Sequence, residues 1–506
     1  MKQITWSQIF FGIFAGSIFA AKGLGLYDGQ GIFRLILILA GICWAGKVVL
    51  TDYSKRDIII SILALGAGLV SYKVSGDKGL LLYIMLLIGA REIPTDKIMH
   101  GALVIWGITF WGLFFATALH VVDSPFKVHE KMGELIIRWG LGYSHPNVLH
   151  VSYLVFCLLL GYYLAERFNI KWLLFMLAGN IFVFMYSVSF TGFIAVAFYL
   201  ILETYFVIFR KDIGKIESIL VKVCAAGCML FSLIAPVVLK GKAFDLVNKI
   251  MNTRFNLSKI YLERYPVSIL GHRIADITTP SSTMDCSYVY AYVAYGSIIF
   301  ICLVIVYAIS LHRCCQEKSL KKITVMLTCL LAGITEPFLF NASFKNVSVL
   351  FLKDNGVNHD KQEILWRGSQ FDRECPFLKN RRNSSEKKTW IRILSYKKVM
   401  IISFFIACIA VMLFAQGTFK NVERIIVPRS ESDLDETFYA ERDLNESDLT
   451  AEDIIYGIPK EGTCWMYLEG KAIQLENIRY MLASGVAAGI FVVIIEGIYF
   501  GCKKRA

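Results

Sequence analysis

Long, nearly charge-free apolar runs recur along this chain, and they limit the folds open to it more than any other feature. The clearest span 31–50, 101–119, 174–186, 192–209, 287–310 and 400–415. Several approach or exceed the roughly 20 residues that a helix needs to cross a bilayer. None shows the short alternating period of a membrane β-strand. We therefore expect an all-α fold, a polytopic integral membrane helix bundle of about 12–14 transmembrane helices with large external loops.

Composition supports a membrane protein and argues against several other classes. Only 18% of the 506 residues are charged, whereas soluble domains average about 25%. The net charge of +13 is typical of basic cytoplasmic loops, so we expect no nucleic-acid partner. The 13 cysteines include no pair at zinc-site spacing, and no nucleotide-binding fingerprint occurs, so we expect neither a metal nor a cofactor. The first apolar stretch lacks a small-x-small cleavage site and is expected to remain as a helix.

The positions of the apolar runs and of the basic residues predict a topology. Helices are expected near 5–22, 31–50, 58–72, 79–92, 98–121, 148–165, 172–188, 190–209, 218–239, 286–310, 322–340, 342–353, 399–416 and 480–500. Loops between alternate helices are basic: TDYSKRD, REIPTDK, ERFNIK, RKDIGK and LHRCCQEKSLKK. Because basic loops stay in the cytoplasm, the N-terminus is expected to be cytoplasmic. The run 342–353 is short for a crossing and also fits a re-entrant segment.

Charge also divides the chain into three expected parts. Residues 1–353 form the polytopic membrane domain. Residues 354–398 carry 11 Lys and Arg against 6 Asp and Glu, as expected of a cytoplasmic linker. Residues 399–506 form a two-helix C-terminal extension. Its segment 417–478 carries 6 basic against 14 acidic residues and is expected outside.

The expected external loop at 240–285 breaks the charge rule. Its basic residues outnumber its acidic ones: Lys240, Lys242, Lys249, Arg254, Lys259, Arg264 and Arg273 against Asp245, Glu263, Asp276 and Asp285. One interpretation is a solvated helix, because long loops are translocated largely regardless of charge. The other is an anion site for a phosphate-bearing ligand, because Arg and Lys bind phosphate oxygens through charge-assisted hydrogen bonds.

The stretch RWGLGYSHPNVLH, residues 138–150, lies in another expected external loop. Pro146 disfavours helix at His145, and Asn147 is suited to cap the helix that follows. A capping turn is therefore one interpretation. The other is a functional histidine, held in a rigid turn beside Tyr143, that acts as a general base or hydrogen-bonds an anion.

Two carboxylates occur in apolar surroundings. Asp285 precedes an expected helix, where an N-cap is the simplest interpretation. Glu336 lies in an apolar expected helix within GITEPFLFNASFKN, and ionisable residues at such depth usually face the bundle interior or a cavity. Lys345 is available as its ion-pair partner. A structural pair and a functional carboxylate both remain open, and we favour the second.

Four motifs in this order resemble those of Wzy-type polysaccharide polymerases of Gram-positive bacteria. They are LGYSHPN, RFNLSKIYLERYPVSILG, MDCSYVYAYVAYGSI and EPFLFNASFKN, and the resemblance covers residues 1–353. The chain departs from the family at Phe190, where Ser-Arg-Thr is common, and at Cys286, where Asp-Asn-Ser-Tyr is common.

The resemblance implies a C-type, metal-independent glycosyltransferase at the outer face of the bacterial cytoplasmic membrane. Its substrate would be a polyprenyl-diphosphate-linked oligosaccharide, polymerised into capsular or exopolysaccharide with the diphosphate carrier as leaving group. A flippase and a chain-length regulator of the same pathway are the expected partners. The diphosphate is expected at Arg254, Arg264 and Arg273, with Arg138 and Lys345 in support.

For the catalytic base, the order of preference is His145, Glu336 and His272. The side chains expected to support the site are Tyr143, Asn147, Asp285, Tyr288 and Asn341. Two other functions remain open. A flippase for the same lipid would show two similar halves and a charged central cavity, and an O-antigen-ligase-like transferase would differ only in its acceptor.

Overall fold

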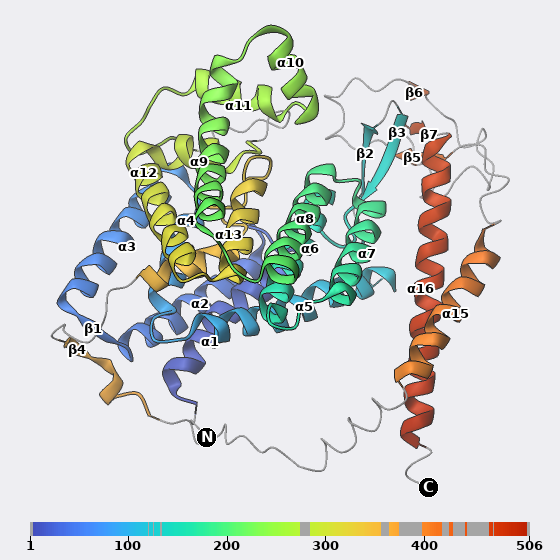
Figure 1. The fold of residues 1–506 in the computed structure, drawn as a ribbon, viewed down its shortest axis with the longest axis horizontal. Helices are drawn as coiled ribbons and strands as arrows, with labels where there is room; N and C mark the ends of the chain where they lie inside the picture. The colour runs from blue at the N-terminus through green and yellow to red at the C-terminus, as the bar shows by residue number, and fades with distance from the viewer. Residues whose placement is uncertain are drawn as a thin grey trace. The chain divides into compact units, whose positions relative to one another are not determined.

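The computed structural model is mainly helical in the part of the chain that it describes (Figure 1). The described residues are 4–119, 121–124, 126–131, 134–273, 284–355, 364–373, 397–416, 425–428, 441–442, 465–468 and 470–502. The chain splits into two compact units. The first comprises Met1–Pro125 and Gly140–Leu378, and the second comprises Phe126–Trp139 and Lys379–Ala506.

Nine helices among the described residues are long and apolar enough to cross a membrane. Eight belong to the first unit: α2 (Gly31–Val49), α3 (Lys55–Ser75), α5 (Thr95–Ala118), α6 (Pro146–Leu164), α7 (Ile170–Ser187), α8 (Phe190–Glu203) with the π-helix η1 (Thr204–Arg210), α9 (Lys215–Val238) and α12 (Ser287–Gln316). The ninth, α16 (Lys471–Cys502), belongs to the second unit. The expected class is confirmed, since the chain is an all-α polytopic membrane protein.

Shorter elements complete the first unit. They are α1 (Trp6–Gly23), α4 (Gly79–Gly89), α10 (Gly241–Ile250), α11 (Arg254–Arg264), α13 (Leu320–Ala332), the 3-10 helices η3 (Val347–Asn355) and η5 (Gly368–Gln370), and the strands β1 (Asp52–Ser54) and β4 (Ile364–Arg367). The two strands pair antiparallel. Almost every residue of α6 is buried, so this helix lies at the centre of the unit.

Local polar signals set several helix ends. Thr5 caps α1 by accepting the N–H of Gln8, and Ser54 forms a capping box with Asp57 at the start of α3. Pro146 is the first residue of α6, where its missing N–H leaves no helical hydrogen bond unmade. Between such ends the helical hydrogen bonds satisfy the backbone, as a bilayer requires.

Polar contacts gather the basic loops on one face, which we call the N-terminal face. The β1–β4 pair lies here. Further contacts join the Ser7 N–H to Asp372 at 3.0 Å, Arg91 to Asp57 at 2.7 Å, Lys321 to Asp96 at 2.7 Å and Lys318 to Asp212 at 2.8 Å. Four of the five basic loops therefore share one face of the first unit, and the fifth follows the end of α6, where the Tyr162 hydroxyl donates to Asp96 at 2.8 Å.

The other ends of these helices form a second face, which we call the site face. Figure 1 shows α10 and α11 at the end of the unit away from β1 and β4. Its contacts join Lys78 to Asp28 at 2.7 Å, Tyr143 to the Gly23 carbonyl at 2.6 Å, Tyr290 to Asp77 at 2.6 Å and Arg254 to Asp285 at 3.0 Å. Turns at 333–346 complete this face.

The expected helices at 322–340 and 342–353 are wrong in detail. Helix α13 ends at Ala332, because the Gly333 and Pro337 that follow oppose its continuation. Turns then lead to η3, a 3-10 helix rather than an α-helix. Lys353 near the end of η3 donates to the Ile93 carbonyl at 2.5 Å, so the chain returns to the N-terminal face.

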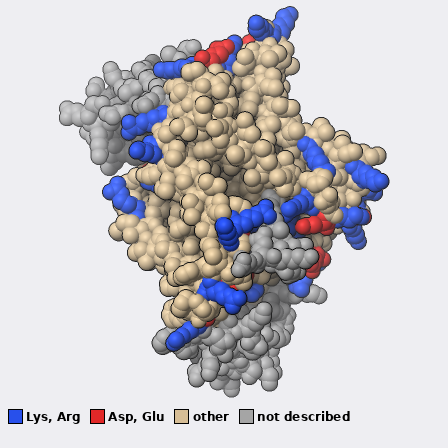
Figure 2. Space-filling view, turned by 90° about the vertical axis from the view of Figure 1, so that its left-hand side faces the viewer, with Lys and Arg blue, Asp and Glu red and all other residues tan. Residues whose placement is uncertain are grey.

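Broad apolar surface surrounds the first unit, as a lipid-embedded bundle requires. Large side chains such as Ile301, Ile305 and Ile309 of α12 are exposed. Figure 2 shows a face on which uncharged side chains cover most of the surface, while Lys and Arg stand in separate groups.

The second unit contains two helices and small sheets. Strands β2 (Phe126–Lys131) and β3 (Glu134–Trp139) form a hairpin beside α16, and α15 (Lys397–Ala415) packs along that helix. A three-stranded sheet has the order β5 (Ile425–Pro428), β7 (Trp465–Leu468) and β6 (Glu441–Arg442). Arg479 of α16 donates to the Ile137 carbonyl at 2.9 Å and pairs with Glu476. The expected helix at 480–500 therefore begins nine residues earlier, because these buried contacts extend it.

Candidate functional site

A strained turn places one arginine inside the site face. Asn252 and Thr253 have left-handed φ values of 49° and 68°, which are uncommon for residues other than glycine. They turn the chain from α10 into α11, whose first residue is Arg254. Phe255 then anchors the helix on Phe231 of α9, with ring centroids 5.7 Å apart. As a result Arg254 is only 8% exposed.

The Arg254 guanidinium lies between two carboxylates. Its Nε is 3.0 Å from Asp285 Oδ2, and its Nη2 is 3.6 Å from Glu336 Oε1. The Thr191 hydroxyl donates to the same Glu336 oxygen at 2.8 Å. We call these four residues the Arg254 cluster. Asp285 is its most exposed acid, with a quarter of its side chain accessible, whereas Glu336 is buried.

A kink in α12 brings its N-terminal end to this cluster. Gly296 has φ 83° and interrupts the helical backbone. The loop after α11 packs against the kink, where the Ser297 N–H donates to the Ser268 carbonyl at 2.9 Å. A Cβ on Gly296 would lie 2.4 Å from the Ile269 carbonyl oxygen. Beyond the kink, the Ser287 hydroxyl donates to the Glu336 carbonyl at 2.6 Å.

Burial changes the acidity of Glu336, which lies in the turns after α13 and outside the nine candidate spans. Burial raises the pKa of its carboxyl to about 7, because desolvation penalises the charged form. The neighbouring Arg254 opposes this rise, and the Asp285 charge adds to it. Such a group can exchange a proton near neutral pH.

Lys345 approaches the same region from the far end of the turns. Burial lowers the pKa of its ammonium to about 7. It donates to the Val148 carbonyl at 3.1 Å and to the Ser152 hydroxyl at 2.9 Å, both on α6. The expected Glu336–Lys345 ion pair is not formed among the described residues, because α6 supplies the closer acceptors.

His145 is the helix cap rather than Asn147, whose expected capping role is wrong. The ring Nδ1 of His145 accepts the Asn147 N–H at 3.1 Å, because the extended backbone at His145 turns its side chain over the first turn of α6. Tyr143 is buried, and its hydroxyl donates to the Gly23 carbonyl at 2.6 Å. The capping interpretation of this stretch therefore describes the observed geometry.

The expected N-cap role of Asp285 is also wrong. Helix α12 begins at Ser287 with Cys286 in the cap position, so Asp285 lies one residue before the cap. Its carboxylate pairs with Arg254 instead, because that buried guanidinium is a stronger partner than backbone N–H groups.

Among the described residues of the first unit, Arg264 and Arg273 form no ion pair with the Arg254 cluster. Arg264 is exposed at the opposite end of α11, about 15 Å along the helix axis. Arg273 is exposed as well, and His272 Nε2 lies 3.1 Å from the Pro266 carbonyl oxygen. Arg138 is buried on β3, within the second unit.

Two supporting residues have structural contacts. The Tyr288 hydroxyl donates to the Leu330 carbonyl at 2.7 Å, and Asn341 accepts the Ser343 N–H at 3.0 Å. Asn341 also lies against Gly79, where a Cβ would come within 2.2 Å of its carbonyl carbon. This close approach holds α4 against the turns that carry Glu336.

Sequence reasoning missed Asp77 and Thr191. Asp77 is buried and accepts the hydroxyls of Tyr290 and Tyr295, each at 2.6 Å. A carboxylate between two apolar helices was its available signal. For Thr191 the signal was its place beside Phe190, where the chain departs from the resembled family.

A buried polar network holds Thr191 in place. The two ring nitrogens of His150 contact Ser187 Oγ at 2.9 Å and Asn180 Oδ1 at 2.8 Å. A Cβ on Gly192 would lie 2.6 Å from His150. The start of α8 is thereby packed tightly against α6, which fixes the position of the Thr191 hydroxyl.

No group of three or more His, Cys, Asp or Glu side chains suited to bind a metal ion occurs among the described residues. No protein-family model matches the chain, and neither the curated proteins nor the solved structures contain a match.

Proposed function

We propose that this protein is a membrane glycosyltransferase that polymerises polyprenyl-diphosphate-linked oligosaccharide repeats. The reaction takes place at the site face, which we place outside the bacterial cytoplasmic membrane, with the N-terminus inside. The observation that carries the proposal is the Arg254 cluster, a buried cation between two acids at the end of a membrane bundle. The resemblance to Wzy-type polymerases supplies the substrate class.

Glu336 is the general base of the proposed reaction. The acceptor hydroxyl oxygen attacks the anomeric carbon of the donor sugar, and Glu336 takes the hydroxyl proton. The bond between that carbon and the diphosphate oxygen breaks, and the diphosphate leaves with the electron pair. Because the pKa of Glu336 is raised to about 7, this group combines an ionised fraction at neutral pH with useful basicity.

Arg254 has two tasks in this scheme. Its guanidinium orients Glu336, and it provides positive charge for the leaving diphosphate, which a planar guanidinium binds in bidentate fashion. We prefer Glu336 to His145 as the base because His145 Nδ1 accepts a backbone N–H. Lys345 supports the site by adding a partial positive charge near neutral pH on the α6 side.

The experiment is a comparison of lipid-linked sugars and surface polysaccharide in a deletion strain. The strain carries the wild-type chain, Glu336→Gln, Arg254→Lys or Arg264→Ala. Glu336→Gln and Arg254→Lys should accumulate single repeats on the carrier at the outer face and make no long polymer. Arg264→Ala should restore polymer, because this exposed residue lies away from the cluster.

Two results would overturn the proposal. Single repeats trapped on the cytoplasmic side of the deletion strain would indicate a flippase. Long polymer that stays on its carrier without transfer to a final acceptor would indicate a ligase. Membrane levels of each variant must match those of the wild type, so that loss of polymer reports loss of activity.

A further inference from the structure

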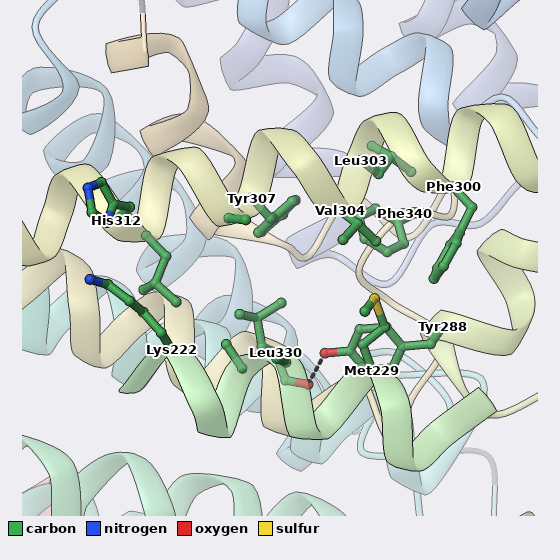
Figure 3. A pocket seen from close by; sticks show the side chains of 14 residues that line it. Lys222, Met229, Tyr288, Phe300, Leu303, Val304, Tyr307, His312, Leu330 and Phe340 are labelled. Atoms are coloured by element: carbon green, nitrogen blue, oxygen red, sulfur yellow. Dashed lines mark hydrogen bonds between the residues drawn. The ribbon is translucent and has the colours of Figure 1, made fainter. Parts of the chain in front are cut away.

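A second feature is a groove in the first unit that begins near the N-terminal face and runs toward the site face. A cavity of about 280 Å³ lies between α9 and α12, with α13 and Phe340 contributing to its wall (Figure 3). We call it the α9–α12 groove. Small residues form it: Ala225 and Ala226 on α9 and Ala308 on α12 leave the two helices apart. Ala226 and Ala308 are exposed, so the groove opens on the lipid-facing surface.

The lining of the groove is apolar except at one end. Phe300, Leu303 and Val304 of α12 face Met229 of α9 along most of its length. Among the described residues, no Asp or Glu lines it. Figure 3 shows that Lys222 and His312 stand together at one end, while Phe300 and Tyr288 stand at the other. The groove is therefore amphipathic along its axis.

The polar end lies near the N-terminal face. Lys222 is seven residues into α9, about 10 Å from its start, and His312 is four residues before the end of α12, about 6 Å. The adjoining loops meet where Lys318 pairs with Asp212. This depth suits side chains that reach the lipid headgroup region from apolar surroundings.

The length of the groove fits one lipid chain. Phe300 and His312 are twelve residues apart on α12, which is about 18 Å along the axis. One leaflet of a bilayer contributes about 15 Å of hydrocarbon. A chain that entered at the level of Lys222 would thus end near Tyr288, below the site face.

The charge of the polar end indicates the headgroup. Among the described residues, neither Lys222 nor His312 has an ion pair or hydrogen-bond partner. A lysine without a counter-ion at headgroup level attracts an anionic lipid. A polyprenyl tail whose diphosphate lay at the Arg254 cluster would enter from the other end, and it would bring no charge to Lys222.

We propose that the α9–α12 groove binds one acyl chain of an anionic phospholipid, whose phosphate pairs with Lys222 at the N-terminal face. The His312 ring donates a second hydrogen bond to that phosphate. The bound lipid fills the space between α9 and α12 and so supports the helices that carry the site above. This proposal does not depend on glycosyl transfer.

Lipid retention by the purified full-length protein tests the charge contact. The protein is washed in detergent containing phosphatidylglycerol and phosphatidylcholine at equal concentration, and bound lipid is counted by native mass spectrometry. The wild type should retain one phosphatidylglycerol. Lys222→Gln should retain about fivefold less, whereas Lys171→Gln, an exposed lysine at the start of α7 outside the groove, should match the wild type.

Filling the groove tests the position of the chain. Ala226→Phe should abolish retention of the lipid, and Ala67→Phe, at an exposed alanine of α3, should leave it unchanged. A phosphatidylglycerol with a photoreactive acyl chain should label α12 peptides around Val304 in the wild-type protein, which keeps the test valid if Ala226→Phe folds poorly.

Four outcomes would overturn the proposal. Retention of phosphatidylcholine equal to that of phosphatidylglycerol would show that Lys222 does not select an anionic headgroup. Retention by Ala226→Phe, or labelling away from α9 and α12, would place the lipid elsewhere. Labelling of the groove by a photoreactive polyprenyl phosphate, with none by phosphatidylglycerol, would assign it to the carrier instead.

Discussion

Nη2 of Arg254 lies 3.6 Å from Oε1 of Glu336, and the two side chains are only 9% and 10% exposed. The pair joins α11, which follows a strained turn, to the turns after α13. Burying both groups costs desolvation energy that their attraction does not reliably recover. An apolar pair would stabilise the same contact at least as well, so the polar pair is better explained by function than by stability.

Removal of Arg254 alone should destabilise the protein. Arg254→Met leaves Glu336 and Asp285 without their shared cation, and the free energy of unfolding should fall by about 3 kcal/mol. The double variant Arg254→Met with Glu336→Gln should recover part of this loss, because the buried charge is gone. Unfolding in detergent at neutral pH measures both.

Arg264→Met is the matched control for this experiment, since it removes an exposed arginine from the same helix. It should leave stability within about 0.5 kcal/mol of the wild type. A stable Arg254→Met protein would show that the cluster is not tightly coupled to folding.

The raised pKa of Glu336 predicts a pH dependence of stability. The pKa rises from 4.5 in the unfolded chain to about 7 in the folded one. Between these values the folded state binds more protons, so stability falls as pH rises through this window. The full contribution is about 3 kcal/mol, present below pH 4.5 and lost above pH 7. Glu336→Gln should remove this slope, as unfolding measured across the window would reveal.

Lys345 should produce the opposite slope at higher pH. Its pKa falls from 10.5 to about 7 on folding. Between these values the unfolded state binds more protons, so stability rises with pH. Lys345→Met should flatten this limb and extend the Glu336 limb to slightly higher pH, because the charge on Lys345 lowers the pKa of Glu336. If stability still depended on pH in the same way after both Glu336→Gln and Lys345→Met, other titrating groups would be responsible.

Thr191 should set the working pH of the proposed base. Its hydroxyl donates to Glu336 Oε1 at 2.8 Å and favours the ionised form. A hydrogen bond to a charged group contributes about 1.5–3 kcal/mol, so Thr191→Val should move the midpoint of the pH–rate profile up by about one unit. Thr191→Ser should leave the midpoint in place. An unmoved midpoint in Thr191→Val would exclude Glu336 as the titrating base.

The sequence was sufficient to predict the helices and most residues of the Arg254 cluster. It was not sufficient to predict which side chains contact one another at the site face. Apolar period and length predict helices well, and Glu336 was marked by its charge within an apolar run. Lys345 donates to Val148 and Ser152, which are nearly 200 residues away from it in the chain. Neither spacing nor composition reports such a contact.

The irregular elements were the hardest to predict. Chain reversal after Ala332 depends on how the turns at 333–346 pack against α4 and α12, which is a tertiary effect.

Which of Arg254 and Arg264 enters the site depends on the direction in which α11 points. Both lie on α11, but the left-handed turn before Arg254 directs only that end into the bundle. The number of basic residues in the loop does not distinguish the buried Arg254 from the exposed Arg264.

Gly296 should be intolerant of substitution. Gly296→Ala would add a Cβ 2.4 Å from the Ile269 carbonyl oxygen, at a φ of 83° that alanine adopts poorly. The loop carrying Gly271 would be displaced, and stability should fall by about 3 kcal/mol. Gly227→Ala on α9, where no atom lies within 4 Å, is the matched control and should be neutral or slightly stabilising. Thermal unfolding compares the two, and equal midpoints would show that the kink is not fixed by this contact.

The orientation of the two faces can be tested with cysteine labelling. Arg264→Cys places a thiol on the site face, and Lys171→Cys places one at the start of α7 on the N-terminal face, both at exposed positions. A membrane-impermeant maleimide applied to intact cells should label Arg264→Cys alone, because the basic loops are retained in the cytoplasm. Peptide mass spectrometry separates these sites from the native cysteines, which the unsubstituted chain controls. Labelling of Lys171→Cys alone would put the Arg254 cluster in the cytoplasm and would exclude polymerisation at the outer face.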